Sequence, residues 1–254
     1  MTSTEIPVGG KPVEAFAGRP EDDAEHPGVL FLVDAIGLRP QIERMVERIA
    51  SWGYVVLAPN VFHRTGTAAE LAPTGDLREP GERERFFATT GPRMEGLGAR
   101  DGVADVAAYL EALRGMPGVA PGPFGVTGYC LGARIATRAA ALHLDDIAAV
   151  GGFHGGRLVT DAPDSPHLGL PQARAEFVYG HADGDSSMPP EAVEALGAAL
   201  SDAGLVHSNA VYPDAPHGYT MEDTSMYHQA AAERQFAELR DLLDRTLGTA
   251  VDQG

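Results

Sequence analysis

The chain has 254 residues, 44% of them apolar, and a formal net charge of −17. That charge argues against nucleic acid or an anionic membrane surface as a partner, and no apolar run reaches the ~18 residues that a membrane span needs. A single cysteine excludes an intramolecular disulfide and a multi-cysteine zinc site. Together with an N-terminus that lacks a basic region followed by an apolar run, it favours a reducing, cytoplasmic location.

From the N-terminus, short apolar runs alternate with segments of helical periodicity. The run at 28–33 is continuously apolar, as expected of a strand buried on both faces. Strands are predicted at 12–16, 28–33, 54–58, 124–127, 147–153, 175–179 and 206–212. Helices are predicted at 41–52, 100–114, 131–141, 190–203 and 225–247. This alternation predicts an α/β fold with a mostly parallel sheet and helices on both faces.

Residues 60–98 interrupt the alternation. The segment contains several Gly and Pro, five arginines and the pair Phe86-Phe87. It is too long for a plain connection between a strand and a helix, so we expect an excursion over the sheet with some helix near 80–90. Substrate contacts and a solvated surface loop are equally compatible with it. Because no composition break marks a linker, residues 1–254 are interpreted as one domain.

A strand, a tight turn and an Ala-rich helix follow one another at 124–141. The turn reads Gly128-Tyr129-Cys130-Leu131-Gly132, which is the G-x-S-x-G nucleophile elbow with a thiol in place of the hydroxyl. Glycines on both sides let the chain pass close to the nucleophile, and the N-terminus of the helix favours a thiolate. An ordinary buried cysteine beside a tight turn is the alternative interpretation.

Polar residues collect after the later strands, where the functional groups of a parallel sheet gather. Asp183 or Asp185 follows the strand at 175–179, and His217 follows the strand at 206–212. With Cys130 they give the order nucleophile, acid, histidine that is typical of α/β-hydrolases. Asp183 is favoured as the acid because it is nearer the strand end, whereas counting back from Pro189 selects Asp185.

These motifs resemble the dienelactone hydrolase family of the α/β-hydrolase fold. The resemblance is carried by GYCLG at 128–132, GHAD at 180–183, PHGY at 216–219 and the turn that starts at Asp34, and it covers residues 12–247. It implies that Cys130 is the nucleophile, His217 the base and Asp183 the orienting acid. It also implies an acidic residue in contact with the resting cysteine, here Asp34, for which a turn-forming aspartate is the alternative interpretation.

The resemblance further implies an oxyanion hole formed by the backbone N–H groups of Leu131 and Ala35. Tyr129 and Tyr219 flank catalytic positions, which is equally compatible with walls of the pocket and with packing alone. Family members that act on dienelactone carry an arginine shortly after the catalytic histidine, where this chain has Met221. The other arginine of that site would be Arg83 or Arg85.

The sequence therefore predicts hydrolysis of an ester or lactone through a cysteine acyl-enzyme. The rival interpretations are a general carboxylesterase acting on neutral esters, a non-catalytic binder of a small carbonyl ligand, and a thiol redox sensor. His63, His167 and His181 show no spacing that pairs them with carboxylates as metal ligands, so we expect neither metal nor cofactor. Both a monomer and a homodimer are compatible with the acidic surface.

Overall fold

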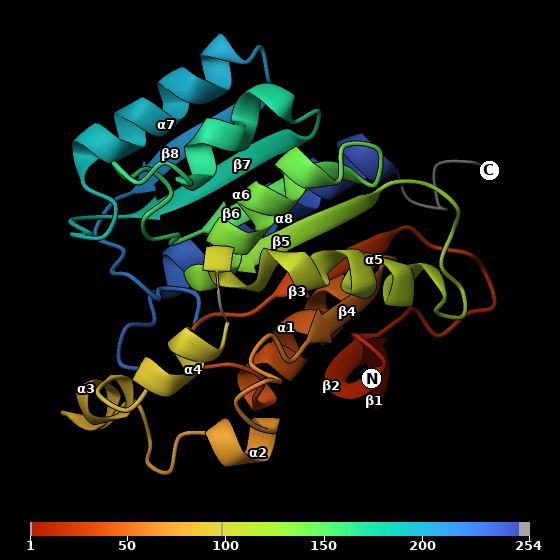
Figure 1. Ribbon diagram of the computed structural model, residues 1–254, viewed down its shortest axis with the longest axis horizontal. Helices are drawn as coiled ribbons and strands as arrows, with labels where there is room; N and C mark the ends of the chain where they lie inside the picture. Colours follow the sequence, from red (N-terminus) through yellow and green to blue (C-terminus); the bar gives the residue numbers. More distant parts are fainter. Residues whose placement is uncertain (1, 98, 249–254) are drawn as a thin grey trace.

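The computed structural model describes residues 2–97 and 99–248, and its central feature is a mixed sheet (Figure 1). In the described part of the chain the sheet has eight strands in the order β1-β2-β4-β3-β5-β6-β7-β8. The strands are β1 (Thr2–Val8), β2 (Lys11–Gly18), β3 (Gly28–Leu32), β4 (Val55–Pro59), β5 (Phe124–Tyr129), β6 (Ile147–Phe153), β7 (Glu176–Ala182) and β8 (His207–Tyr212). β2 pairs antiparallel with β1 and β4, and all other pairs are parallel.

Helices cover both faces of the sheet (Figure 1). The longer ones are α1 (Pro40–Ala50), α5 (Val106–Arg114), α6 (Leu131–Leu142), α7 (Pro190–Asp202) and α8 (Gln229–Leu247). α1 and α8 pack together on one face, where Arg48 pairs with Glu233 and lies over the ring of Phe236. α5, α6 and α7 lie on the other face. The predicted α/β architecture is confirmed, with every residue of β3, β4 and β5 buried as their apolar runs require.

The N-terminal strand β1 was not predicted from the sequence. It forms a hairpin with β2 through Gly9 and Gly10, which have φ angles of 57° and 78°. Two glycines with positive φ make a tight turn whose twist matches that of the flanking strands. A Gly-Gly pair between two strand-forming segments was therefore a usable signal.

The excursion at 60–98 contains three short helices, α2 (Ala68–Leu71), α3 (Glu82–Phe87) and α4 (Gly91–Gly96). α3 lies within the predicted helical stretch. A 3₁₀ segment, η1 (Ala99–Asp105), leads into α5, and a second one, η2 (Pro166–Gln172), interrupts the Pro-rich loop after β6. Figure 1 shows α2, α3 and α4 gathered outside the sheet. The excursion therefore does not add a further layer of helices to either face of the sheet.

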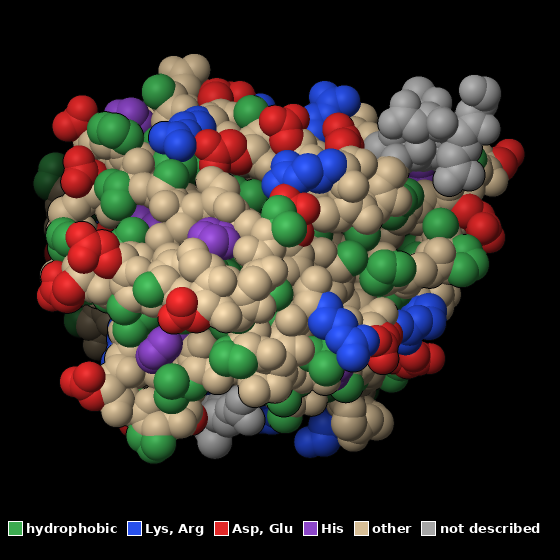
Figure 2. Space-filling view, turned by 90° about the horizontal axis from the view of Figure 1, so that it is seen from above, with side chains coloured by type: hydrophobic (Ala, Val, Ile, Leu, Met, Phe, Trp, Pro, Cys, Tyr) green, Lys and Arg blue, Asp and Glu red, His purple; other side chains and the backbone are tan. Residues whose placement is uncertain are grey.

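Figure 2 shows acidic side chains scattered across the visible face, and several of the basic ones there lie beside acidic ones. Exposed arginines accordingly form ion pairs, as Arg174 does with Asp145 and Arg245 with Glu176. None of the helices in the described ranges is both long enough and apolar enough to cross a bilayer.

Candidate active site

Cys130 sits at a strained turn between β5 and α6. Its φ is 52° and its ψ is −109°, a backbone conformation that a residue with a side chain rarely adopts. A Cβ on Gly128 would lie 2.2 Å from the carbonyl oxygen of Gly132, and a Cβ on Gly132 would lie 2.1 Å from that of Leu32. Both contacts are with backbone, so the turn requires glycine at both positions.

Three side chains from three strand ends form a continuous hydrogen-bonded chain. His217 Nε2 lies 3.0 Å from the Sγ of Cys130, and His217 Nδ1 lies 2.5 Å from Oδ2 of Asp185. Asp185 follows β7, His217 follows β8 and Cys130 follows β5. The imidazole therefore bridges the thiol and the carboxylate in the geometry of a nucleophile, a base and an orienting acid.

The prediction that Asp183 is the acid is wrong, because the carboxylate bonded to His217 belongs to Asp185. β7 continues to Ala182, three residues beyond the predicted strand end, so Asp183 begins the turn. Its carboxylate is exposed and accepts a hydrogen bond from the N–H of Asp214. Gly184, with a φ of 62°, then turns the chain so that Asp185 reaches Nδ1 of the imidazole.

Electrostatics favour a proton on His217. Burial alone would lower its pKa, but the sulfur of Cys130 and the carboxylate of Asp185 together raise the pKa of His217 to about 10. Burial would raise the pKa of Asp185, yet its hydrogen bonds with His217 and Ser187 bring it to about 2. At neutral pH the imidazolium thus lies between a carboxylate and the sulfur.

Asp34 follows β3, beside Cys130, but its carboxylate is bound elsewhere. Arg39 donates to both of its oxygens at 2.8 and 3.0 Å, and the N–H groups of Ile36 and Gly37 donate to Oδ1. Arg39 also pairs with Asp223 at 2.6 Å. Within the described residues no hydrogen bond between Asp34 and Cys130 is recorded, although both line one pocket; the carboxylate of Asp34 is held by Arg39 and by the turn after β3.

The two predicted oxyanion donors belong to segments next to Cys130. Leu131 is the first residue of α6, where an N–H has no acceptor within its helix. No acceptor is recorded for the N–H of Ala35 in the described part of the chain, and Ala35 lines the pocket around Cys130. That pocket has a volume of about 100 Å³ and is lined mainly by apolar groups, among them Ile36, Phe87 and Met221.

The predicted substrate-contacting residues divide into one that reaches this pocket and three that do not. Arg83 lines it, and its guanidinium lies 4.8 Å from the ring centroid of Phe87. Arg85 instead pairs with Glu82 on the surface. Tyr129 and Tyr219 are fully buried, and their hydroxyls bond to Gln235 and to the carbonyl of Gly180. Tyr129 points towards α8, because successive side chains along a strand alternate between faces.

His154 also lines the pocket, at the end of β6 and with a φ of 38°. It is 1% exposed, its Nε2 bonds to the hydroxyl of Thr220 at 2.7 Å, and its ring lies edge-on to His217 at 5.3 Å. Burial, and then the charge of His217, lower the pKa of His154 well below its ordinary value. It is therefore a neutral imidazole beside a charged one.

Two arginines at the site were not found from the sequence. Arg39 pairs with a residue 184 positions away, and Arg93 of α4 bonds to the carbonyls of Ala35 and Ile36. No local sequence pattern predicts contacts between residues so far apart in the chain. No cluster of three or more His, Cys, Asp and Glu side chains that could hold a metal occurs in the ranges that the structure describes.

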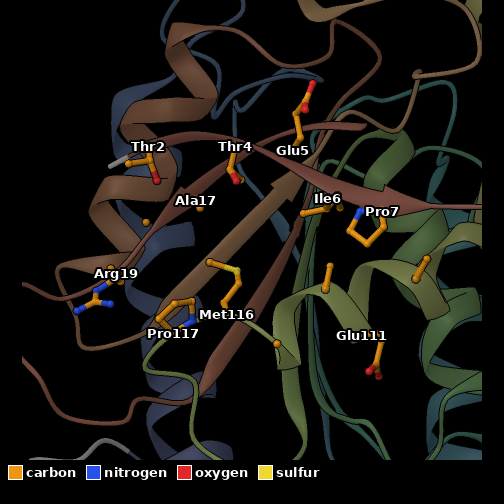
Figure 3. Close-up of a pocket in the computed structure, with 14 residues that line it drawn as sticks. Thr2, Thr4, Glu5, Ile6, Pro7, Ala17, Arg19, Glu111, Met116 and Pro117 are labelled. Carbon is orange, nitrogen blue, oxygen red and sulfur yellow. The ribbon is translucent and has the colours of Figure 1, made fainter. Parts of the chain in front are cut away.

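A larger hollow, of about 640 Å³, lies between the β1–β2 hairpin and α5 (Figure 3). Thr4, Arg19, Glu111 and Met116 are among the residues that line it. None of the Cys130, His217 and Asp185 side chains reaches it. The chemistry is therefore expected in the smaller pocket.

Cys130 at the glycine-flanked turn after β5, Asp185 after β7 and His217 after β8, on a mostly parallel sheet, have the arrangement of the α/β-hydrolase fold. A model of the dienelactone hydrolase family matches residues 13–247, so the chain belongs to that family. The protein is thus a carboxylic ester hydrolase, and the family supports hydrolysis of esters or lactones.

Individual relatives agree. A Salmonella typhi protein provisionally named a carboxymethylenebutenolidase is 28% identical over 238 residues, covering 91% of this chain and 82% of its own. A Klebsiella pneumoniae protein provisionally identified as a dienelactone hydrolase has a similar structure (TM-score 0.76, 24% identity, 96% and 98% of the two chains). A dienelactone hydrolase-like promiscuous phosphotriesterase from metagenomic libraries also has a similar structure (TM-score 0.79, 18% identity, covering 96% of this chain and 97% of the other). At these identities the two structures support the fold alone.

Proposed function

We propose that this protein hydrolyses small esters or lactones through a thioester formed on Cys130. The observation that carries the proposal is the alignment of Asp185, His217 and Cys130, with separations of 2.5 and 3.0 Å, at the strained turn before α6. A thiol whose sulfur lies 3.0 Å from Nε2 of His217 can transfer its proton to that nitrogen, so His217 acts as the base that activates Cys130.

The reaction would proceed in two halves. The sulfur attacks the carbonyl carbon, and the negative charge on the carbonyl oxygen is stabilised by the N–H groups of Leu131 and Ala35. When the tetrahedral intermediate collapses, His217 gives its proton to the departing alkoxide and leaves an acyl-thioester. Water then attacks the thioester, His217 takes one of its protons, and the acid departs while the sulfur regains its charge.

The pocket supports a small acyl group. A volume of about 100 Å³ is well below the ~300 Å³ typical of pockets for drug-sized ligands, so long acyl chains do not fit inside it. Arg83 has no carboxylate partner among the described residues, which favours an anionic group on the substrate. Met221 supplies no second cation, so we propose a single ionic contact at Arg83.

The proposal is tested with purified protein and its Cys130→Ser variant on p-nitrophenyl acetate, a dienelactone and neutral lactones. Loss of turnover in C130S of at least about a hundredfold is expected for every compound that is hydrolysed. Full turnover in C130S would contradict the acyl-enzyme and favour a binding role for the pocket.

The ionic contact is tested separately with Arg83→Met, using Arg85→Met as the matched control from the same helix. R83M should raise KM for the dienelactone by about tenfold, a loss of one charge-assisted contact, and leave p-nitrophenyl acetate unchanged. Equal effects of R83M and R85M would show that neither arginine contacts the substrate.

A further inference from the structure

Arg93 is a buried arginine with an unusual set of partners. It lies on α4 in the excursion and is 6% exposed. Its Nη1 donates to the carbonyls of Ala35 at 3.1 Å and Ile36 at 2.9 Å, and its Nη2 donates to that of Leu71 at 2.6 Å. One guanidinium thus joins the turn after β3 to the end of α2.

No carboxylate lies within 4 Å of this guanidinium among the residues that the structure describes. Its other neighbours are aromatic: the ring centroids of Phe62 and Phe86 lie 5.5 and 4.9 Å from its central carbon. Burial lowers the pKa of Arg93 from its ordinary value. A desolvated cation without an ion-pair partner within 4 Å costs free energy, of which the more distant charge of Asp34 offsets only a part, so a merely structural link between two loops would be made at lower cost by neutral groups.

The position of the charge gives it a use. Ala35 carries both the carbonyl that Arg93 holds and the N–H proposed to stabilise the oxyanion. From the other side, Asp34 is held by Arg39 and accepts from the N–H of Ile36. The backbone at Ala35 is therefore fixed on both flanks, with a positive charge behind it in a site of low dielectric.

We propose that Arg93 is a positioning residue for the oxyanion hole: it fixes the Ala35 N–H through the adjacent carbonyls and places a cation behind the developing negative charge. This inference rests on the proposed function, because it assumes that an oxyanion forms at Cys130. It also gives the excursion a part in the reaction, since α4 carries Arg93 while α2 supplies its third acceptor.

The test compares two reactions of the same sulfur. Acylation by p-nitrophenyl acetate, read as the burst of p-nitrophenolate, forms an oxyanion. Alkylation by iodoacetamide displaces iodide at a saturated carbon and forms none, so it reports only the Cys130–His217 pair. Arg93→Met, Arg93→Lys and the surface control Arg85→Met are measured in both reactions.

R93M is expected to lower the acylation rate and kcat by about ten- to hundredfold. This reduction does not exceed the one that removal of an oxyanion-hole donor causes. For this variant, KM should change by less than about threefold. Its alkylation rate should stay within about twofold of wild type, and R85M should match wild type in both. R93K should recover only part of the acylation rate, because an ammonium cannot bridge three carbonyls with a planar fork.

A chemical-rescue experiment provides a second test of the role of Arg93. In Arg93→Ala, guanidinium chloride at about tens of millimolar, far below unfolding concentrations, should restore part of the acylation rate while leaving alkylation unchanged. Acylation by R93M at the wild-type rate would overturn the proposal, as would a parallel loss of acylation and alkylation. If R93M and R93A do not fold, R93K decides: an unchanged acylation rate overturns the proposal, and a selective loss supports it.

Failure of the underlying function is read independently. If C130S hydrolyses p-nitrophenyl acetate as fast as wild type, the reaction does not pass through this sulfur, whatever the Arg93 variants do. If C130S is inactive and R93M acylates at the wild-type rate, the proposed function is supported and only the proposed role of Arg93 is contradicted.

Discussion

At the scale of single residues, the site depends on which carboxylate reaches His217. Asp185 is 6% exposed at its side chain and accepts from the N–H and hydroxyl of Ser187 as well as from His217. These bonds fix the imidazole with one nitrogen towards the sulfur. Asp183, two residues earlier, is bonded to the turn at Asp214 and plays no part in this chain of contacts.

We therefore predict opposite outcomes for two isosteric substitutions. Asp185→Asn should lower kcat/KM for p-nitrophenyl acetate by about 10²- to 10⁴-fold, because the amide neither stabilises the imidazolium nor selects its tautomer. Asp183→Asn should stay within about threefold of wild type. Steady-state kinetics of the two purified variants decide the matter, and a larger loss in D183N than in D185N would reverse the assignment.

His154 provides a prediction on pH. Its pKa is lowered in the folded protein, so below about pH 6.5 the unfolded chain binds a proton there that the folded one does not. Stability must then fall as the pH decreases through this range, by up to about 1.4 kcal/mol per pH unit from this group.

The matched variant is His154→Asn, because asparagine tolerates the positive φ at this position. Urea unfolding at a series of pH values should give a shallower slope for H154N than for wild type below about pH 6, and equal slopes between about pH 7 and 8. Parallel curves throughout would mean that His154 is protonated in the folded state.

At the scale of elements, the elbow links β5 to α6 through contacts between backbones. Gly132 packs against the last residue of β3, Leu32, and Gly128 against the first turn of α6. Neither neighbour can move without displacing a buried strand or helix. The same closeness places the first turn of α6, which Cys130 immediately precedes, against the end of β3.

Gly132→Ala is accordingly expected to lower the free energy of unfolding by more than about 3 kcal/mol, as overpacking against fixed backbone does at its upper range. The control is Gly91→Ala in α4, where a Cβ would have nothing within 4 Å and the change should be under about 0.5 kcal/mol. Urea unfolding measures both. Similar stabilities for the two variants would mean that the turn relaxes easily.

At the scale of the whole molecule, one sheet gathers residues that are distant in sequence. The carboxyl ends of parallel strands meet at one edge, so Asp34, Cys130, Asp185 and His217 converge although they span most of the chain. The chain as a whole is strongly acidic, with a net charge of −17. Surface ion pairs offset little of the resulting repulsion, since exposed pairs contribute about 0–1 kcal/mol each.

We predict that salt stabilises the protein by screening this repulsion. The Tm should rise by a few degrees between about 10 and 150 mM NaCl, and then level off once the Debye length falls below about 8 Å. Differential scanning calorimetry gives the curve. A Tm that falls with salt would mean that surface ion pairs outweigh the net charge.

Much of this architecture follows from local sequence alone. Buried strands such as 28–33 are recognisable because residues shielded on both faces must be apolar, and the elbow because only glycine permits its close backbone approach. The order of Cys130, an acid and His217 likewise follows from strand ends. The hairpin at β1 was missed although Gly9-Gly10 signalled it.

What only the tertiary structure decided is which side chains meet. Choosing Asp185 over Asp183 required the true end of β7 and the path of the turn at Gly184. Tyr129 points away from the pocket because of the pleat of β5. The ion pairs of Arg39 with Asp34 and Asp223 form only when separate loops pack together. The same holds for the hydrogen bond from Arg93 to Ala35. The physical reason is that propensity and periodicity act over a few neighbouring residues. Hydrogen bonds between loops depend instead on distances that exist only after the sheet has formed.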